Sequence, residues 1–196
     1  VTVTLACLIG CTLLLFARWE LIIIGALCVL FAFLYTTGPY PLSYNGWGDV
    51  LVIIFFGFVP VGGTYYVQAL TWTPDVTIAS IICGLVIDTL LVVNNYRDRE
   101  ADARSGKRTV IVRFGEKFGR YFYLLLGISA SLLCLYFLRE GHIYAALLPQ
   151  LYLVPHVLTW RRMVKIHSGK KLNSILGETS RNMLFMGILL AIGMIL

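Results

Sequence analysis

Residues 94–115, NNYRDREADARSGKRTVIVRFG, place a dense cluster of charge directly after a long apolar segment. If that segment continues as a helix, Asn94, Asp98 and Asp102 lie four residues apart along one stripe, and Asn95 lies close to it. These side chains offer oxygen ligands without a His or Cys, the donor set that Mg²⁺ prefers. The pattern therefore predicts a magnesium site formed by Asn94, Asn95, Asp98 and Asp102.

Basic side chains are interleaved with these acids. Residues 97–120 hold eight of the sixteen Lys and Arg residues. Carboxylates alone would repel a phosphate, whereas Mg²⁺ can bridge the two anions while basic groups bind the phosphate oxygens. We therefore expect Arg97, Lys107 and Arg108 to bind a diphosphate at the mouth of an intramembrane cavity. The alternative is a solvated loop that only sets topology, but adjacent asparagines at the membrane end are costly and favour a functional site.

The rest of the chain is too apolar for a soluble domain. Of its 196 residues, 59% are hydrophobic and 13% are charged, whereas soluble domains average about 25% charged residues. The long segments are apolar throughout rather than alternating, which argues against a transmembrane barrel and indicates helices. In such a protein the net charge of +6 reports topology and is no evidence for a nucleic-acid partner.

The sequence predicts an all-α, multi-pass transmembrane helical bundle. Its seven expected spans are residues 1–17, 21–35, 50–70, 76–93, 122–138, 143–158 and 183–196. The odd-numbered links between spans contain Arg18 and Arg139, whereas the other fourteen basic residues lie in or beside the even-numbered links. Because cytoplasmic loops are enriched in Lys and Arg, the even-numbered links are predicted to face the cytoplasm.

The second link, residues 36–49, contains Gly, Pro and aromatic residues but no basic residue. This composition is typical of an interfacial aromatic belt, and the same turn could instead form one wall of the site mouth. Asn45 and Asp49 are four residues apart and are a weaker candidate pair for a metal. Asp88, inside the fourth span, is expected either to be a hydrogen-bonded structural acid or to face the cavity.

The remaining polar and cysteine side chains favour structural roles. We expect His156 to pack inside the bundle or at the interface, and His142 and His167 to be solvated. The five cysteines lie in apolar runs, where a free Cys behaves as a small hydrophobic residue. Gly57 and Pro60 in the third span predict a kinked helix that another backbone approaches closely.

The charged stretch resembles the second Asp-rich motif of the UbiA superfamily of intramembrane aromatic prenyltransferases. The matching residues are Asn94-Asn95-Tyr96-Arg97-Asp98, then Asp102, then Gly106-Lys107-Arg108-Thr109. Within the superfamily, the stretch is most similar to the 1,4-dihydroxy-2-naphthoate polyprenyltransferases of menaquinone biosynthesis. Residues 35–42, YTTGPYPL, and the segment that follows Leu172 are weaker likenesses.

The resemblance implies a Mg²⁺-dependent transfer of a polyprenyl group from polyprenyl diphosphate to 1,4-dihydroxy-2-naphthoate. CO₂ and diphosphate would leave, and the product would be a demethylmenaquinone. Asp98 and Asp102 would be the catalytic acids. The protein would lie in the lipid bilayer of the inner (cytoplasmic) membrane, with its site loops on the cytoplasmic side. Two other interpretations stay open: a prenyltransferase for another aromatic acceptor, and a transporter whose acidic cluster is a cation site.

Members of this superfamily have nine transmembrane helices and two Asp-rich motifs, and residues 1–93 contain no match to the first motif. The seven spans therefore correspond to helices three to nine. We expect residues 1–196 to be a single transmembrane prenyltransferase domain that lacks its first two helices and is inactive by itself.

Overall fold

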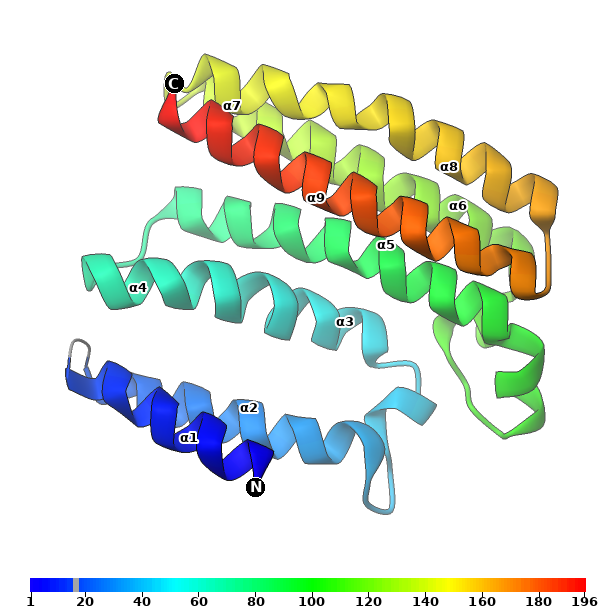
Figure 1. Cartoon of the computed structure of the whole chain (residues 1–196), viewed down its shortest axis with the longest axis horizontal. Coiled ribbons are helices and arrows are strands. Elements are labelled where there is room, and N and C mark those ends of the chain that lie inside the picture. Colours follow the sequence, from blue (N-terminus) through cyan, green and yellow to red (C-terminus); the bar gives the residue numbers. More distant parts are fainter. Residues whose placement is uncertain (16–17) are drawn as a thin grey trace.

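The computed structural model describes residues 1–15 and 18–196, which form seven helical rods that follow one another along the chain (Figure 1). The rods are α1 (Thr2–Thr12) with η1 (Leu13–Leu15); α2 (Glu20–Thr36); α3 (Gly48–Val52), η3 (Ile53–Gly62) and α4 (Gly63–Ala69); α5 (Pro74–Arg104); α6 (Val110–Cys134) with η4 (Leu135–Leu138); α7 (Ile143–Leu147), η5 (Leu148–Tyr152) and α8 (Leu153–Ile166); and η6 (Lys170–Leu172) with α9 (Asn173–Ile195). A further short turn, η2 (Leu42–Tyr44), lies in the second link. No described residue belongs to a β-strand, so the all-α prediction is confirmed.

The seven rods correspond one to one with the seven predicted spans, although residues 16–17 of the first span lie outside the described residues. Two predicted starts were too late. The fifth helix begins at Val110 rather than at residue 122, and the last α-helix begins at Asn173 rather than at residue 183. In both cases the first turns of the helix contain charged residues. A hydropathy analysis assigns such residues to the links between spans, although here they are helical.

In the described part of the chain, four rods are long and apolar enough to cross a membrane: Gly48–Ala69, Pro74–Arg104, Val110–Leu138 and Lys170–Ile195. The helices over Thr2–Leu15 and Glu20–Thr36 are apolar but shorter. The rod over residues 143–166 is divided by the 3-10 turn η5, which contains Pro149. Its second half ends in a basic segment, which lowers its mean hydropathy.

Side-chain caps fix where the two central helices begin. Thr73 accepts a hydrogen bond from the backbone N–H of Val76 at 3.4 Å, and Pro74 occupies the first turn of α5. Thr109 accepts in the same way from Val112 at 3.3 Å at the start of α6. Because α5 continues without a break to Arg104, it carries the charged motif beyond the apolar segment, as predicted.

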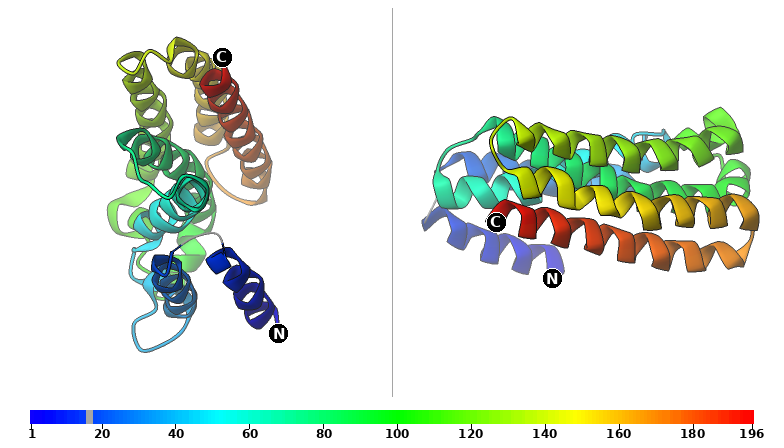
Figure 2. Two further views of the ribbon diagram at one scale, coloured as in Figure 1. Left: turned by 90° about the vertical axis from the view of Figure 1, so that its left-hand side faces the viewer. Right: turned by 90° about the horizontal axis from the view of Figure 1, so that it is seen from above.

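Helices α5, α6, α8 and α9 form a four-helix group, the rod α3–α4 lies against α5, and α1 and α2 lie on the far side of that rod (Figures 1 and 2). The even-numbered links meet at one end of the bundle. Arg113 on α6 bonds to Asn45 in the second link, and His167 in the sixth link pairs with Glu116 on α6. The links that hold most of the basic residues therefore share one end.

Two hydrophobic clusters form the core of the four-helix group. One joins α5, α6, α7 and α9 through residues such as Ile82, Phe137 and Met186. The other lies nearer the charged motif and includes Tyr96, Tyr123 and Ile175. Helices α1 and α2 contribute no buried residue to either cluster.

Glycines let the third rod approach α5 closely. A Cβ placed on Gly57 would lie 2.9 Å from the Cα of Gly84, and one on Gly84 would lie 3.0 Å from the Cα of Ile53. Gly57 lies inside the π-helical segment η3, which also contains Pro60. The kink predicted from the glycines and the proline therefore appears as a wider helical turn packed backbone to backbone.

This contact predicts a stability effect. Gly57→Ala should lower the free energy of unfolding by about 1–2 kcal/mol, because backbone atoms of α5 must move to admit the methyl group. Gly63→Ala is the matched control, since a Cβ at Gly63 meets nothing within 4 Å. Unfolding of both purified variants in mixed detergent micelles measures the difference, and equal stability would mean that the two rods are not in close contact.

Candidate active site

Arg97 is the centre of the first half of the site. Its guanidinium donates to both carboxylate oxygens of Asp98, from Nε at 2.7 Å and from Nη2 at 2.6 Å. Nη2 also donates to Oδ1 of Asn94 at 2.8 Å, and Nη1 donates to Oδ1 of Asn173 on α9 at 3.0 Å. Three of the four predicted residues on this turn of α5 are thus joined, and Asn173 is an additional partner.

Lys107 and Asp102 form the second half of the site. Nζ of Lys107 lies 3.1 Å from Oδ1 of Asp102. This hydrogen bond raises the pKa of Lys107 above its ordinary value, and the negative charges of Asp102 and Asp98 act in the same direction. Lys107 is therefore a stable cation, and it lies within electrostatic reach of both Asp98 and Asp102.

A tight turn returns the chain from Asp102 to Lys107. The backbone N–H of Lys107 donates to the carbonyl of Asp102 at 2.9 Å, and Gly106 has a φ of 79°, which a side chain would disfavour. The Ser105 hydroxyl donates to the same carbonyl at 3.0 Å. The sequence spacing between Asp102 and Gly106-Lys107 therefore corresponds to a tight turn that brings the Lys107 side chain back to the Asp102 carboxylate.

The donor set fits a magnesium–diphosphate group better than a bare metal. Among residues 1–15 and 18–196, no three His, Cys, Asp or Glu side chains form a metal-binding group. Two acids are nevertheless enough for Mg²⁺ when substrate phosphates complete its coordination. Here each acid is paired with a basic side chain, Arg97 with Asp98 and Lys107 with Asp102, and basic side chains of this kind form charge-assisted hydrogen bonds with phosphate oxygens.

The other two predicted site residues lie outside this arrangement. Asn95 is 9% exposed, and its side chain forms no hydrogen bond with another described residue. Arg108 donates from its backbone N–H to the carbonyl of Tyr44 at 2.7 Å, while its side chain is exposed. Their roles toward a metal and a diphosphate therefore remain predictions.

The second link lies against the charged loop. The Nζ atom of Lys107 lies over the ring of Tyr44, 5.3 Å from the ring centre. Nη2 of Arg113 donates to the carbonyl of Asn45 at 2.8 Å. The amide of Asn45 donates to Pro41 at 2.8 Å, which ties it to its own turn and not to Asp49. The link thus lies where the expected wall would be, and its Asn45–Asp49 pair does not resemble a metal site.

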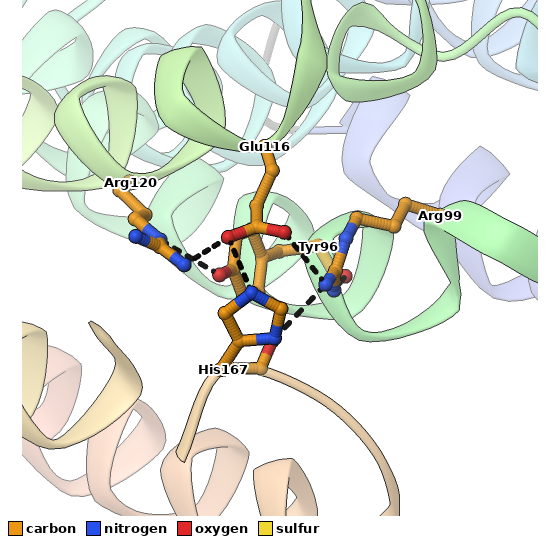
Figure 3. Close-up of polar contacts among 5 residues, drawn as sticks. All are labelled: Tyr96, Arg99, Glu116, Arg120 and His167. Carbon is orange, nitrogen blue, oxygen red and sulfur yellow. Dashed lines mark hydrogen bonds and ion pairs between the residues drawn. The ribbon is translucent and has the colours of Figure 1, made fainter. Parts of the chain in front are cut away.

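A second polar cluster joins α5, α6 and the sixth link (Figure 3). Glu116 accepts from Nη2 of Arg99 at 3.0 Å and from Arg120, and His167 Nε2 lies 3.0 Å from the same carboxylate. Arg120 Nε also donates to the hydroxyl of Tyr96 at 2.9 Å. The sequence analysis missed this cluster, because its members are 3 to 71 residues apart and no motif unites them. His167 is exposed as predicted, but it is paired with an acid rather than simply solvated.

Two buried polar residues inside the spans have separate roles. His156 bonds to the hydroxyl of Tyr152 at 3.0 Å and to the carbonyl of Leu124 at 3.2 Å, which confirms the predicted packing role. Both carboxyl oxygens of Asp88 are buried without a hydrogen-bond partner among the described residues. Of the two expectations for Asp88, the hydrogen-bonded structural acid is therefore wrong, and a position facing the cavity stays a prediction.

Comparison with known proteins decides the family. A family model described as the UbiA prenyltransferase family matches residues 1–194. This chain belongs to the UbiA family. The match covers the charged motif, the second link and α9, so the likeness predicted from the motif extends over nearly all of the chain.

Individual UbiA relatives agree with this assignment. The chain is 38% identical over 141 residues to the 1,4-dihydroxy-2-naphthoate octaprenyltransferase of Escherichia coli, which is 69% of this chain and 46% of that protein. It is 39% identical over 132 residues to the enzyme of the same name from Mycobacterium tuberculosis, covering 67% and 45%. It is also 30% identical over 173 residues to the UbiA prenyltransferase domain-containing protein 1 of Dictyostelium discoideum, covering 88% and 51%.

The UbiA chain spans about half the length of the curated relatives that it matches. No solved structure matches it.

Proposed function

We propose that this chain forms part of a Mg²⁺-dependent aromatic polyprenyltransferase and supplies its second Asp-rich site. The enzyme would transfer a polyprenyl group from polyprenyl diphosphate to 1,4-dihydroxy-2-naphthoate, with loss of CO₂ and diphosphate. The observation that supports this most is the pair of neighbouring ion pairs, Arg97–Asp98 and Lys107–Asp102, at the end of a membrane helix. The names of several relatives support the choice of acceptor.

In this proposal the chain's own residues bind and orient the diphosphate. Arg97 presents a planar guanidinium that suits two phosphate oxygens at once, and Lys107 presents a single ammonium group. Mg²⁺, when bound by Asp98 and Asp102, would neutralise charge that develops on the leaving diphosphate. Asn173 would hold Arg97 in place from α9 while the guanidinium exchanges a carboxylate for a phosphate.

The surrounding helices would exclude water from the reacting carbon. The apolar part of α5 lies directly below the charged turn, and Val92 and Val93 are fully buried there. An allylic cation that forms beside the motif would otherwise be captured by water. The Tyr44 ring beside Lys107 covers the charged loop from the second link.

The experiment that tests this function is a prenyl-transfer assay with the full-length membrane protein and a panel of aromatic acceptors. With 1,4-dihydroxy-2-naphthoate, we expect magnesium-dependent release of diphosphate and a prenylated product that has lost the ring carboxylate. A simple hydroxybenzoate should be a poor acceptor. Turnover with the hydroxybenzoate alone would assign the protein to another acceptor class, and absence of any transfer would refute the proposal.

We also propose that the protein lies in the inner (cytoplasmic) membrane with the charged motif on the cytoplasmic side. Ser105→Cys and Ser168→Cys place exposed thiols in the two basic links, and Glu140→Cys places one at the opposite end. A thiol reagent that does not cross membranes should label Glu140→Cys in intact cells. It should label Ser105→Cys and Ser168→Cys only after the membrane has been permeabilised. The parent protein gives the background from the native cysteines, and the reverse labelling pattern would invert the topology.

A further inference from the structure

A cavity with both charged and apolar lining residues lies between α8 and α9, away from the charged motif. Its volume is about 660 Å³, and all the residues that line it come from these two helices. No residue of α5 or of its loop lines it, so it is separate from the candidate active site. Its size is within the range of cavities that bind small molecules, about 300–1,000 Å³.

Three arginines surround this cavity. Arg161 and Arg162 lie on α8 and Arg181 lies on α9, and all three are exposed. Nη1 of Arg162 lies 2.6 Å from Oε1 of Glu178, which is the only acid lining the cavity. Arg161 and Arg181 form no ion pair with any described residue. The lining therefore has a net charge of +2, and two of its guanidinium groups are free to bind an anion.

The floor of the cavity between the arginines is polar and already ordered. Asn182 donates from Nδ2 to the hydroxyl of Thr159 at 3.0 Å, and that hydroxyl lies 3.5 Å from Oε2 of Glu178. Thr159 is 3% exposed and Asn182 is 8% exposed. These buried polar groups hold α8 and α9 together at the level of the arginines, and their oxygen and amide groups suit a ligand that is polar at this depth.

The charged and apolar residues of the cavity follow one another along the axes of α8 and α9. On α8, the apolar residues Pro155 and Leu158 precede Arg161, and α8 runs toward the charged end of the bundle. On α9, which runs away from that end, Phe185 follows Arg181 by one turn. On both helices the arginine thus lies about 4–6 Å nearer the charged end than the apolar residue, given a rise of about 1.5 Å per residue.

We propose that this cavity binds an anionic phospholipid of the leaflet at the charged end of the bundle. The phosphate would lie between Arg161 and Arg181, and the glycerol and ester groups would lie over Thr159 and Asn182. One acyl chain would follow Leu158 and Phe185 toward the middle of the membrane, where these side chains are 53% and 38% exposed. Basic pockets between transmembrane helices recognise anionic headgroups by this combination of charge and depth.

Free phosphate and inorganic diphosphate fit the cavity less well, because neither has an apolar part to cover the exposed faces of Leu158 and Phe185. Polyprenyl diphosphate has such a part, but no residue of the charged motif that is proposed to bind its diphosphate lines this cavity. A zwitterionic phospholipid has the apolar part but brings a cation that the two unpaired arginines would repel. The order of charge and apolar surface therefore favours a lipid with a net negative headgroup.

Native mass spectrometry of the full-length protein tests this, with phosphatidylglycerol and phosphatidylcholine titrated separately. We expect phosphatidylglycerol to bind more tightly. Arg161→Gln and Arg181→Gln should each weaken its binding about fivefold, and the double variant about 25-fold, since a basic residue near the membrane surface contributes about that factor. Phosphatidylcholine binding should not weaken in any variant, because its choline group is not attracted by the arginines.

Two control variants separate charge from folding. Lys165→Gln removes an exposed cation from the same helix but outside the cavity, and it should bind phosphatidylglycerol like the parent. Arg161→Lys with Arg181→Lys keeps both charges and should retain most of the affinity. If the double Gln variant and Lys165→Gln bind alike, or if both lipids bind the parent equally, the proposal is wrong.

A photoreactive phosphatidylglycerol with its label in the acyl chain then locates the site. Label should appear in peptides that contain Leu158 or Phe185, and excess inorganic diphosphate should not prevent it. Label elsewhere only would overturn the location. Displacement by diphosphate would instead assign the cavity to the substrate and overturn the lipid. Neither measurement depends on turnover, so both outcomes are independent of the proposed prenyl transfer.

Discussion

Replacing Asp98 or Asp102 with Asn should slow prenyl transfer by the full-length protein at least about 100-fold, the scale on which loss of one preorganised electrostatic group acts. Asn keeps the shape of the side chain but removes the charge that would hold Mg²⁺ against the diphosphate. It also leaves Arg97 or Lys107 without its carboxylate partner. Binding of the aromatic acceptor should change much less, because the acceptor need not touch the metal.

Glu100→Gln is the matched control for these two variants. Glu100 is an exposed acid on the same stretch of α5, and it forms no ion pair with a described residue. Its variant should have normal turnover. Activity must be compared at equal amounts of folded protein in the membrane, because a loss of protein would imitate a loss of catalysis. Near-normal turnover of Asp98→Asn and Asp102→Asn at normal protein levels would end the assignment of the metal site.

Lys107→Met should separate diphosphate binding from metal binding in the same assay. Charge-assisted hydrogen bonds contribute about 1.5–3 kcal/mol, so the Michaelis constant for polyprenyl diphosphate should rise about 10-fold or more. The magnesium concentration at half-maximal rate should change little, because both carboxylates remain. An unchanged Michaelis constant would show that Lys107 only caps the loop onto Asp102.

Glu116→Gln should lower the free energy of unfolding by about 3 kcal/mol, the lower end of the cost of removing one partner from a buried ion pair. The change leaves Arg99, Arg120 and His167 without their shared carboxylate (Figure 3). The Arg99 side chain is only 10% exposed, so its charge cannot be solvated fully. The carboxylate itself is 28% exposed, which keeps the expected cost at the lower end.

Detergent unfolding and hydrogen exchange together measure this effect. Besides the lower stability, we expect faster exchange in residues 166–170, because Glu116 and Arg99 are what attach the sixth link to α5 and α6. Glu100→Gln again serves as the control, since it removes a charge without removing a partner. Unchanged stability together with unchanged exchange would mean that the cluster is solvated and contributes little.

The sequence predicted the fold class and the placement of the motif residues along α5, because both depend on local patterns. Apolar segments several helical turns long identify the rods. The alignment of Asn94, Asp98 and Asp102 on one stripe of the helix follows directly from the helical period. The loop from Asp102 to Lys107 is also local, and the glycine at position 106 has the positive φ that its turn requires.

What the sequence could not predict depends on contacts between distant segments. Asn173 bonds to Arg97 across 76 residues, and Arg99 bonds to the carbonyl of His167 across 68 residues. No spacing rule connects such pairs, because they form only when α9 and the sixth link pack against α5. The late start predicted for the fifth helix has another cause. Its first turns carry Arg113 and Lys117, and charge at a membrane surface hides a helix from a hydropathy analysis.

The position of α9 in both hydrophobic clusters has a consequence for biogenesis. Its residues Met186 and Leu190 belong to one cluster and Ile175 belongs to the other, so neither cluster is complete before α9 is in place. Helices α1 and α2 leave the ribosome earlier. They bury no side chain, so both can remain in the lipid bilayer before the four-helix group has formed. Assembly of the four-helix group must therefore follow insertion of α9, and an insertase or chaperone would have to shield the half-formed α5–α6 pair until then.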